Sequence, residues 1–258
     1  MKREYKLSSI IIMILISAVV SFITSSLFQA IAGESELMIF VGQIIIMVLT
    51  LIFEFAMSSG LIRNRMGSVG EYLNQVNYIN GKIILINILV KLVLTFIISL
   101  ASMVGGAFAF FAFASQGLNG GGTIGMILLI LAIFIFTIIY SLLITYTNFY
   151  LADFYVGNGQ KPGLGQAIKD IFKIGKDLLA KTFIIYLKAI IVPILLLLGI
   201  FALGFMTGPD FGMGKALVLT LIVIVLAVYS IVVGGIILAR LSDRYLDYME
   251  VNRAYFER

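Results

Sequence analysis

The sequence contains no cysteine, no histidine and no tryptophan. Without Cys and His it can form no disulfide, no Cys/His zinc site, no His-ligated haem and no Ser-His-Asp triad. Without Trp, tyrosine must supply any aromatic belt at a membrane surface. Charged residues are scarce as well, at 12% of the chain, against about 25% in soluble domains. These absences exclude the commonest metal and nucleophilic sites.

Apolar residues are what the sequence has in excess. They make up 61% of the 258 residues, against about 45–50% in a soluble domain, and the mean hydropathy is +1.12. Too little polar surface remains to cover a globule in water, so lipid is the solvent for most of the chain. The net charge of +5 is then explained by topology signals and lipid headgroup contacts, and no nucleic-acid partner is expected.

Six apolar stretches are long enough to cross a bilayer, which requires about 20 helical residues. The sequence therefore predicts an all-α, polytopic membrane protein with one transmembrane domain over residues 1–258. The third and fourth stretches exceed a single crossing and must tilt or extend beyond the membrane. The expected spans lie near 8–30, 37–61, 83–114, 123–156, 182–206 and 214–239.

The positive charges predict the orientation of these spans. Of the eighteen Lys and Arg residues, all except Lys91, Lys188 and Lys215 fall at the two ends of the chain or in the gaps 62–82 and 157–181. Short segments rich in Lys and Arg stay in the cytoplasm. Both termini are therefore expected to be cytoplasmic. The cations of the two ends are Lys2, Arg3, Lys6, Arg240, Arg244, Arg253 and Arg258.

Both cytoplasmic gaps contain an apolar stripe with the i, i+3, i+4, i+7 spacing of an amphipathic helix. We expect two such helices in the headgroup layer, the second near 164–180. On its polar face, Lys169, Lys173 and Lys176 either set topology or contact headgroups or a cytoplasmic partner. The stripes lie at a fixed offset of 99 residues, which is compatible with a parallel internal repeat. They consist of Val69, Tyr72, Leu73, Val76 and Ile79, and of Ile168, Ile171, Phe172, Gly175 and Leu178.

Four charged residues, Glu54, Lys91, Asp153 and Lys188, fall within the expected spans. A charge at the bilayer centre costs at least about 2.5–3.5 kcal/mol, so such groups usually face the protein interior and find partners. Glu54 with Lys91, and Asp153 with Lys188, are predicted to pair and to line a polar cleft open to the cytoplasm. Two alternatives remain: the lysines extend to the headgroups, or the pairs only fix helix register.

Two segments resemble known membrane proteins. The segment 157–203, "GNGQKPGLGQAIKDIFKIGKDLLAKTFIIYLKAIIVPILLLLGIFAL", resembles a signature of six-span bacterial proteins. This loose superfamily includes the membrane domain of some glycerophosphodiester phosphodiesterases and uncharacterised proteins of Gram-positive bacteria. Ser59–Leu94 is similar to the equivalent earlier loop. The resemblance implies architecture only and carries no catalytic residue. The expected location is the plasma membrane of a bacterium.

A weaker resemblance concerns exporter-type ABC permeases. The segment Arg63–Lys91 is similar to the loop before their third span, where a cytoplasmic helix contacts an ATPase. The amphipathic helix that usually precedes their first span is missing here. This resemblance implies an ATPase as a partner.

Three functional hypotheses follow. The first is a transport or export component that handles a lipid or a hydrophobic peptide. The second is a non-transporting partner or immunity protein that acts through helix–helix contacts in the membrane. The third, an intramembrane enzyme, is not expected, because Glu54 and Asp153 lie on separate hairpins beside lysines that favour their ionised forms. No cofactor is expected. The partners considered are membrane lipids, an ATPase or other membrane protein, and a second copy of the chain in a homodimer.

Overall fold

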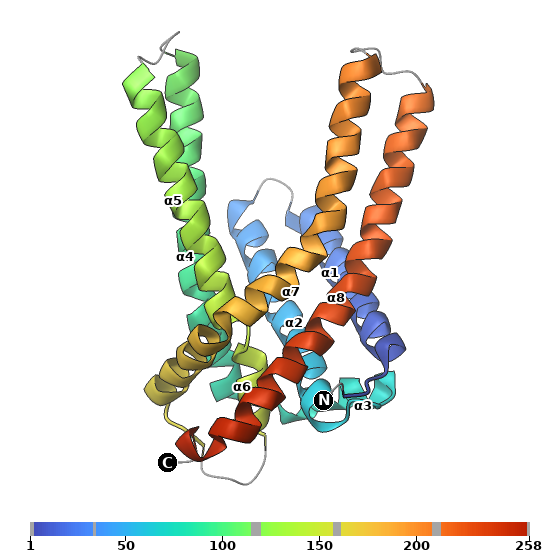
Figure 1. Ribbon diagram of the computed structural model, residues 1–258, viewed down its shortest axis with the longest axis vertical. Coiled ribbons are helices and arrows are strands. Elements are labelled where there is room, and N and C mark those ends of the chain that lie inside the picture. The colour runs from blue at the N-terminus through green and yellow to red at the C-terminus, as the bar shows by residue number, and fades with distance from the viewer. Residues whose placement is uncertain (1–2, 33–34, 115–119, 157–160, 208–212, 257–258) are drawn as a thin grey trace. The chain divides into compact units, whose positions relative to one another are not determined.

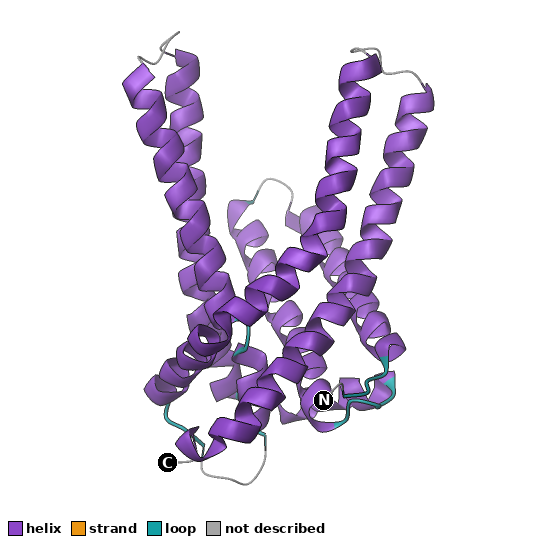
Figure 2. Cartoon of the chain, in the orientation of Figure 1, coloured by secondary structure: helices purple, strands orange, loops and turns teal. Residues whose placement is uncertain are grey.

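The computed structural model describes residues 3–32, 35–114, 120–156, 161–207 and 213–256. Two of the predicted topology cations, Lys2 and Arg258, lie outside these ranges. Within them the regular structure is helical and contains no strand, which confirms the all-α class (Figure 2). Six helices are long and apolar enough to cross a membrane, as the sequence predicted.

Each predicted span overlaps one of the six long helices, and the last two of these helices extend well beyond their predicted spans (Figure 1). The six helices are α1 Leu7–Ala32, α2 Glu36–Arg63, α4 Gly81–Ala114, α5 Gly120–Ile144, α7 Leu164–Thr207 and α8 Met213–Phe256. Three short elements connect them: α3 Val69–Leu73, the 3-10 helix η1 Asn74–Tyr78, and α6 Thr147–Phe154.

Helix α7 differs from the expectation of a surface helix near 164–180 followed by a separate span. It is one helix of 44 residues with Pro193 inside it. No turn residue separates the two parts, because Ala180 and Lys181 at the expected junction are good helix formers. Pro193 has no N–H to donate to the carbonyl of Ala189. The hydroxyl of Tyr229 on α8 donates to that carbonyl instead, at 2.8 Å, so the proline is accommodated within the helix.

The fourth predicted span, 123–156, is divided into α5 and α6. The turn between them contains Thr145 and Tyr146. Hydroxyl groups around this turn donate to backbone carbonyls three or four residues earlier: Ser141 to Thr137 at 2.8 Å, Thr145 to Ser141 at 2.8 Å, and Thr147 to Ile144 at 2.7 Å. Such side chains compete with the helical ladder and favour a bend or a break.

The chain forms two compact units: unit 1 is residues 1–79 and 180–258, and unit 2 is residues 80–179. In unit 1, α1 packs along α2, and α8 packs against both helices. Helices α3 and η1 pack against α2, where the buried ring of Tyr72 covers Gly60. A Cβ atom at Gly60 would lie 2.6 Å from that ring, so glycine allows this close approach.

In unit 2, α4 packs against α5 and α6. Tyr146, Phe149 and Tyr150 are buried in its core together with Ile171 and Ile174 of α7. The first part of α7 thus uses its apolar stripe to pack on protein, whereas the sequence led us to expect that stripe against the headgroup layer. The two predicted amphipathic segments also differ in form, since one is α3 with η1 and the other is the beginning of α7.

Two contacts explain why this part of α7 is anchored to unit 2. A Cβ at Gly175 would lie 2.6 Å from the carbonyl carbon of Leu143, so the two backbones meet closely, as small residues allow in helix packing. The buried carboxylate of Asp170 accepts hydrogen bonds from the hydroxyl of Tyr150 at 2.8 Å and from the amide of Gln166 at 2.7 Å. A buried charge is tolerated when such donors surround it.

Candidate functional site

The four intramembrane charges predicted from the sequence are distributed over both units. Glu54 on α2 and Lys188 on α7 belong to unit 1, whereas Lys91 on α4 and Asp153 on α6 belong to unit 2. Each predicted pair therefore joins one residue from each unit, and both pairs and their shared cleft stay predictions. Lys188 is exposed and the other three are partly exposed.

The predicted docking lysines lie on the first part of α7. Lys169 and Lys176 are exposed and Lys173 is partly buried, whereas Ile171 and Ile174 on the other face are buried. The division into a polar and an apolar face is confirmed, and a docking role for the lysines stays a prediction. In the described part of the chain, no cluster of three or more acidic side chains could hold a metal ion.

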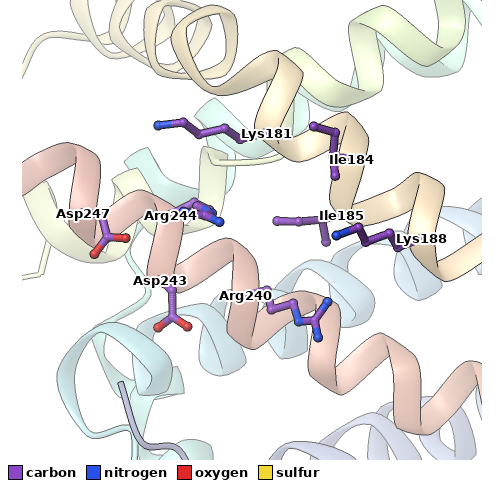
Figure 3. Close-up of a pocket in the computed structure, with 8 residues that line it drawn as sticks. All are labelled: Lys181, Ile184, Ile185, Lys188, Arg240, Asp243, Arg244 and Asp247. Carbon is purple, nitrogen blue, oxygen red and sulfur yellow. The ribbon is translucent and has the colours of Figure 1, made fainter. Parts of the chain in front are cut away.

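A pocket of about 550 Å³ lies between α7 and α8 within unit 1 (Figure 3). We call it the basic pocket. Both helices contribute four side chains with i, i+3, i+4, i+7 spacing, which places each set on one helix face. The lining consists of Lys181, Ile184, Ile185 and Lys188 from α7, and of Arg240, Asp243, Arg244 and Asp247 from α8.

The two carboxylates of the basic pocket are already paired with cations from elsewhere in unit 1. Arg65 in the loop after α2 lies 2.5 Å from Asp243, and Arg3 lies 2.7 Å from Asp247. Arg3 also pairs with Glu250. In Figure 3 the carboxylate of Asp243 points away from α7. The acids of α8 therefore bind the N-terminal segment and the α2–α3 loop.

Several backbone contacts hold Arg65 in place. Its carbonyl accepts from the amide of Lys6 at 3.0 Å and from the hydroxyl of Tyr72 at 3.3 Å. The hydroxyl of Ser9 donates to the carbonyl of Gly67 at 2.8 Å in the same loop. The side chains of Arg65 and Asp243 are only 12% and 18% exposed. This shielding from water makes their pairing stronger than that of a fully exposed ion pair.

The four cations of the basic pocket have no such partners. Lys181, Lys188, Arg240 and Arg244 are exposed, and their side chains make no ion pair or hydrogen bond with any residue that the structure describes. Lys188 and Arg244 point toward each other in Figure 3, with Ile185 between them. Cations that line one pocket repel one another, so an anion in the pocket would relieve their repulsion.

The basic pocket lies where the charged part of each helix meets its apolar part. No charged residue occurs between Lys188 and Asp210 or between Lys215 and Arg240. Leu187, Ile190, Ile191 and Val228, on the apolar side of the pocket, are large hydrophobic side chains that are 48–56% exposed. Such a boundary is expected at the level of the lipid headgroups.

Sequence reasoning did not identify this pocket. It treated Arg240 and Arg244 as topology signals and did not use Asp243, Asp247 and Glu250. A signal was present, because these three acids recur at i, i+4 and i+7 on one face of a segment that also carries the arginines. Their partners, Arg3 and Arg65, lie far away in the sequence, and no local pattern links them to α8.

Comparisons with protein-family models, curated proteins and solved structures found no match to this chain. The resemblances described from the sequence therefore stay hypotheses.

Proposed function

We propose that this protein is a membrane-embedded transport or export component that handles an amphipathic anion, with a lipid as the first candidate. The observation that supports the proposal is the basic pocket, which combines four cations that have no partner among the described residues with the apolar side chains of Ile184 and Ile185. An amphipathic anion needs both kinds of surface next to each other. The proposal includes a bacterial plasma membrane and cytoplasmic termini, which would place the pocket at the cytoplasmic leaflet.

The lining chemistry favours a lipid over a purely apolar peptide. Lys and Arg side chains bind phosphate and carboxylate groups, and Ile184 and Ile185 provide apolar contacts beside them. The face of α7 that lines the pocket continues at the same helical spacing through Ile191, Val192 and Leu195, which are exposed. A lipid whose headgroup lies in the pocket therefore keeps its acyl chains on an apolar surface while the lipid moves.

The test is lipid translocation in reconstituted vesicles. The purified full chain is placed in vesicles that contain a fluorescent anionic phospholipid, and dithionite reports the fraction of label in the outer leaflet over time. We expect faster exchange than in protein-free vesicles, and slower exchange with the Arg240→Gln, Arg244→Gln double variant. The matched control is Lys169→Gln with Lys176→Gln, which removes two exposed cations of unit 2.

Two results would contradict the proposal. One is exchange in wild-type vesicles no faster than in protein-free vesicles. The other is equal exchange in the wild type and the arginine double variant, which would show that any movement does not depend on the pocket.

A further inference from the structure

We infer that the basic pocket binds a lipid headgroup with at least two negative charges, supplied by a phosphate monoester or by two phosphodiesters. The inference rests on the proposed function and deepens it by naming the substrate class. Three observations support it. The lining has an excess of positive charge, and its two acids are paired with cations from outside the pocket. The pocket also lies where the charged parts of α7 and α8 meet their apolar parts.

The charge of the lining favours a headgroup with more than one negative charge. Four cations and two carboxylates line the pocket, which gives a formal charge of +2 if the carboxylates are counted against the lining cations, and of +4 if they are counted with their partners Arg65 and Arg3. A headgroup with one negative charge leaves an excess positive charge in either count, and a headgroup with two charges leaves less. Basic pockets between membrane helices on the cytoplasmic side are a known arrangement for headgroups with several charges.

The pairing of the acids keeps the four cations free for a ligand. Asp243 and Asp247 line the pocket, yet their partners are Arg65 and Arg3 from outside it. If the two carboxylates instead turned to Arg240 and Arg244, they would neutralise half of the binding cations. Arg65 and Arg3 therefore act as positioning residues, because they hold the carboxylates away from the ligand.

The donor geometry fits phosphate oxygens. Arg240 and Arg244 lie one helical turn apart on α8, and Lys181 and Lys188 lie two turns apart on α7. Arginine can bind phosphate with two parallel hydrogen bonds, and lysine adds a point charge. The pocket volume of about 550 Å³ exceeds that of a single inorganic anion and lies in the range of ligand pockets, about 300–1,000 Å³.

A lipid fits better than a soluble phosphate compound because of the apolar surroundings. Ile184 and Ile185 line the pocket, and the exposed side chains of Ile191, Val192 and Leu195 continue the same helix face beyond Lys188. Acyl chains would cover this surface, whereas a soluble phosphate would leave it uncovered. Lipid and free phosphate share the same headgroup chemistry, and the experiment below separates them.

The experiment is a lipid titration of the purified full chain in detergent, followed by native mass spectrometry. The probes are phosphatidic acid with one phosphate monoester, cardiolipin with two phosphodiesters, phosphatidylglycerol with one charge, and zwitterionic phosphatidylcholine. We expect at least one doubly charged lipid to bind about fivefold to tenfold more tightly than phosphatidylglycerol, since each added charge near Lys or Arg contributes modestly. Equal affinities for the singly and doubly charged lipids would overturn the inference.

Variants assign the preference to the basic pocket. Arg240→Gln with Arg244→Gln should abolish it, and the control Lys169→Gln with Lys176→Gln should keep it. Because Arg240 and Arg244 are exposed and unpaired among the described residues, their replacement should leave the fold intact. Arg65→Gln should also reduce the preference by freeing Asp243. A preference that survives the arginine double variant would refute the site.

A competition experiment separates the two sources of phosphate. Glycerol 3-phosphate in solution should displace the bound lipid only at concentrations far above that of the lipid. Displacement at comparable concentrations would show a site for a soluble phosphate compound and would overturn the lipid assignment.

The inference and the proposed function can fail separately. A preference for doubly charged lipids without translocation in vesicles would keep the headgroup site and remove the transport function. Translocation with no preference between singly and doubly charged lipids would keep the transport function and remove the inferred headgroup class.

Discussion

The guanidinium group of Arg65 donates to the carboxylate of Asp243 at 2.5 Å and thereby joins residues that are 178 positions apart. The carbonyl of Arg65 also accepts from the amide of Lys6. One residue therefore connects the N-terminal segment, the loop after α2, and α8. This connection holds α8 against the first hairpin of unit 1 and directs Asp243 away from α7.

Breaking this ion pair should destabilise unit 1. We expect Arg65→Leu to reduce the free energy of unfolding by about 1.5–3 kcal/mol, because a hydrogen bond to a charged group is lost and a shielded carboxylate loses its partner. The measurement is the thermal midpoint of the detergent-solubilised protein, followed by fluorescence-detected size exclusion of a tagged chain.

A double-mutant cycle shows whether the effect comes from the pair. Combining Arg65→Leu with Asp243→Leu should cost less than the sum of the two single changes. Arg240→Leu on the same helix is the control and should change stability by no more than about 0.5 kcal/mol. Additive single losses would mean that Arg65 and Asp243 do not interact.

The crossing of α7 and α5 should depend on Gly175. A Cβ there would lie 2.6 Å from the carbonyl carbon and 2.7 Å from the Cα atom of Leu143. Since backbone atoms cannot move aside cheaply, Gly175→Ala should destabilise unit 2 by about 1–3 kcal/mol. The readout is the thermal midpoint in detergent.

The control for Gly175 lies in the same helix. No atom lies within 4 Å of a Cβ at Gly165, so Gly165→Ala should be neutral or stabilising by up to about 1 kcal/mol through helix propensity. Equal effects of the two substitutions would contradict a close backbone approach at Gly175.

The stability of unit 1 should fall at high pH because of Tyr72. Burial raises the pKa of Tyr72 from 10.0 to about 12, so the folded state favours the neutral phenol. This contribution is fully present below pH 10, where both states are neutral, and is lost as the pH rises from 10 through 12. Phe cannot ionise, so Tyr72→Phe should gain stability relative to the wild type over this range.

The measurement compares thermal midpoints at pH 9 and about 11.5 for the wild type, Tyr72→Phe and Tyr78→Phe. Tyr78 is 49% exposed, and its substitution corrects for general effects of alkaline pH. If the gap between wild type and Tyr72→Phe stays constant with pH, ionisation of Tyr72 does not affect folding.

The proposed orientation predicts where reporters become active. A reporter fused after Phe256 should lie in the cytoplasm, and one inserted between α1 and α2 should lie outside, because one membrane crossing separates the N-terminus from that loop. Paired fluorescent and alkaline phosphatase fusions measure this. Activity of both fusions on the same side would refute the orientation.

The helices of this protein could largely be predicted from residues close in sequence. A membrane helix satisfies its backbone hydrogen bonds within one segment, so local hydrophobicity is enough to find it. The structure differs from the prediction where local signals competed. The hydroxyls of Ser141, Thr145 and Thr147 interrupt the fourth span, whereas the absence of a turn signal near Lys181 lets α7 continue.

The candidate site was much less predictable. The arginines of α8 were visible in the sequence, but the pocket is lined by side chains of both α7 and α8, among them Lys188 and Arg244. The buried role of Asp170 was also hidden, because its partner Tyr150 lies on another helix. Side-chain partners on different helices leave no periodic signal in either segment.

By itself the sequence determined that lipid surrounds most of this protein, that the protein is helical, and approximately where its six spans begin and end. Each of these properties depends on the composition of continuous segments of the chain. Only the tertiary structure decided which charges are paired and which are free. Arg3 and Arg65 neutralise the acids of α8 while Lys181, Lys188, Arg240 and Arg244 stay available within the described residues. The physical reason is that ion pairing depends on distance in space, which for these residues bears no relation to distance along the chain.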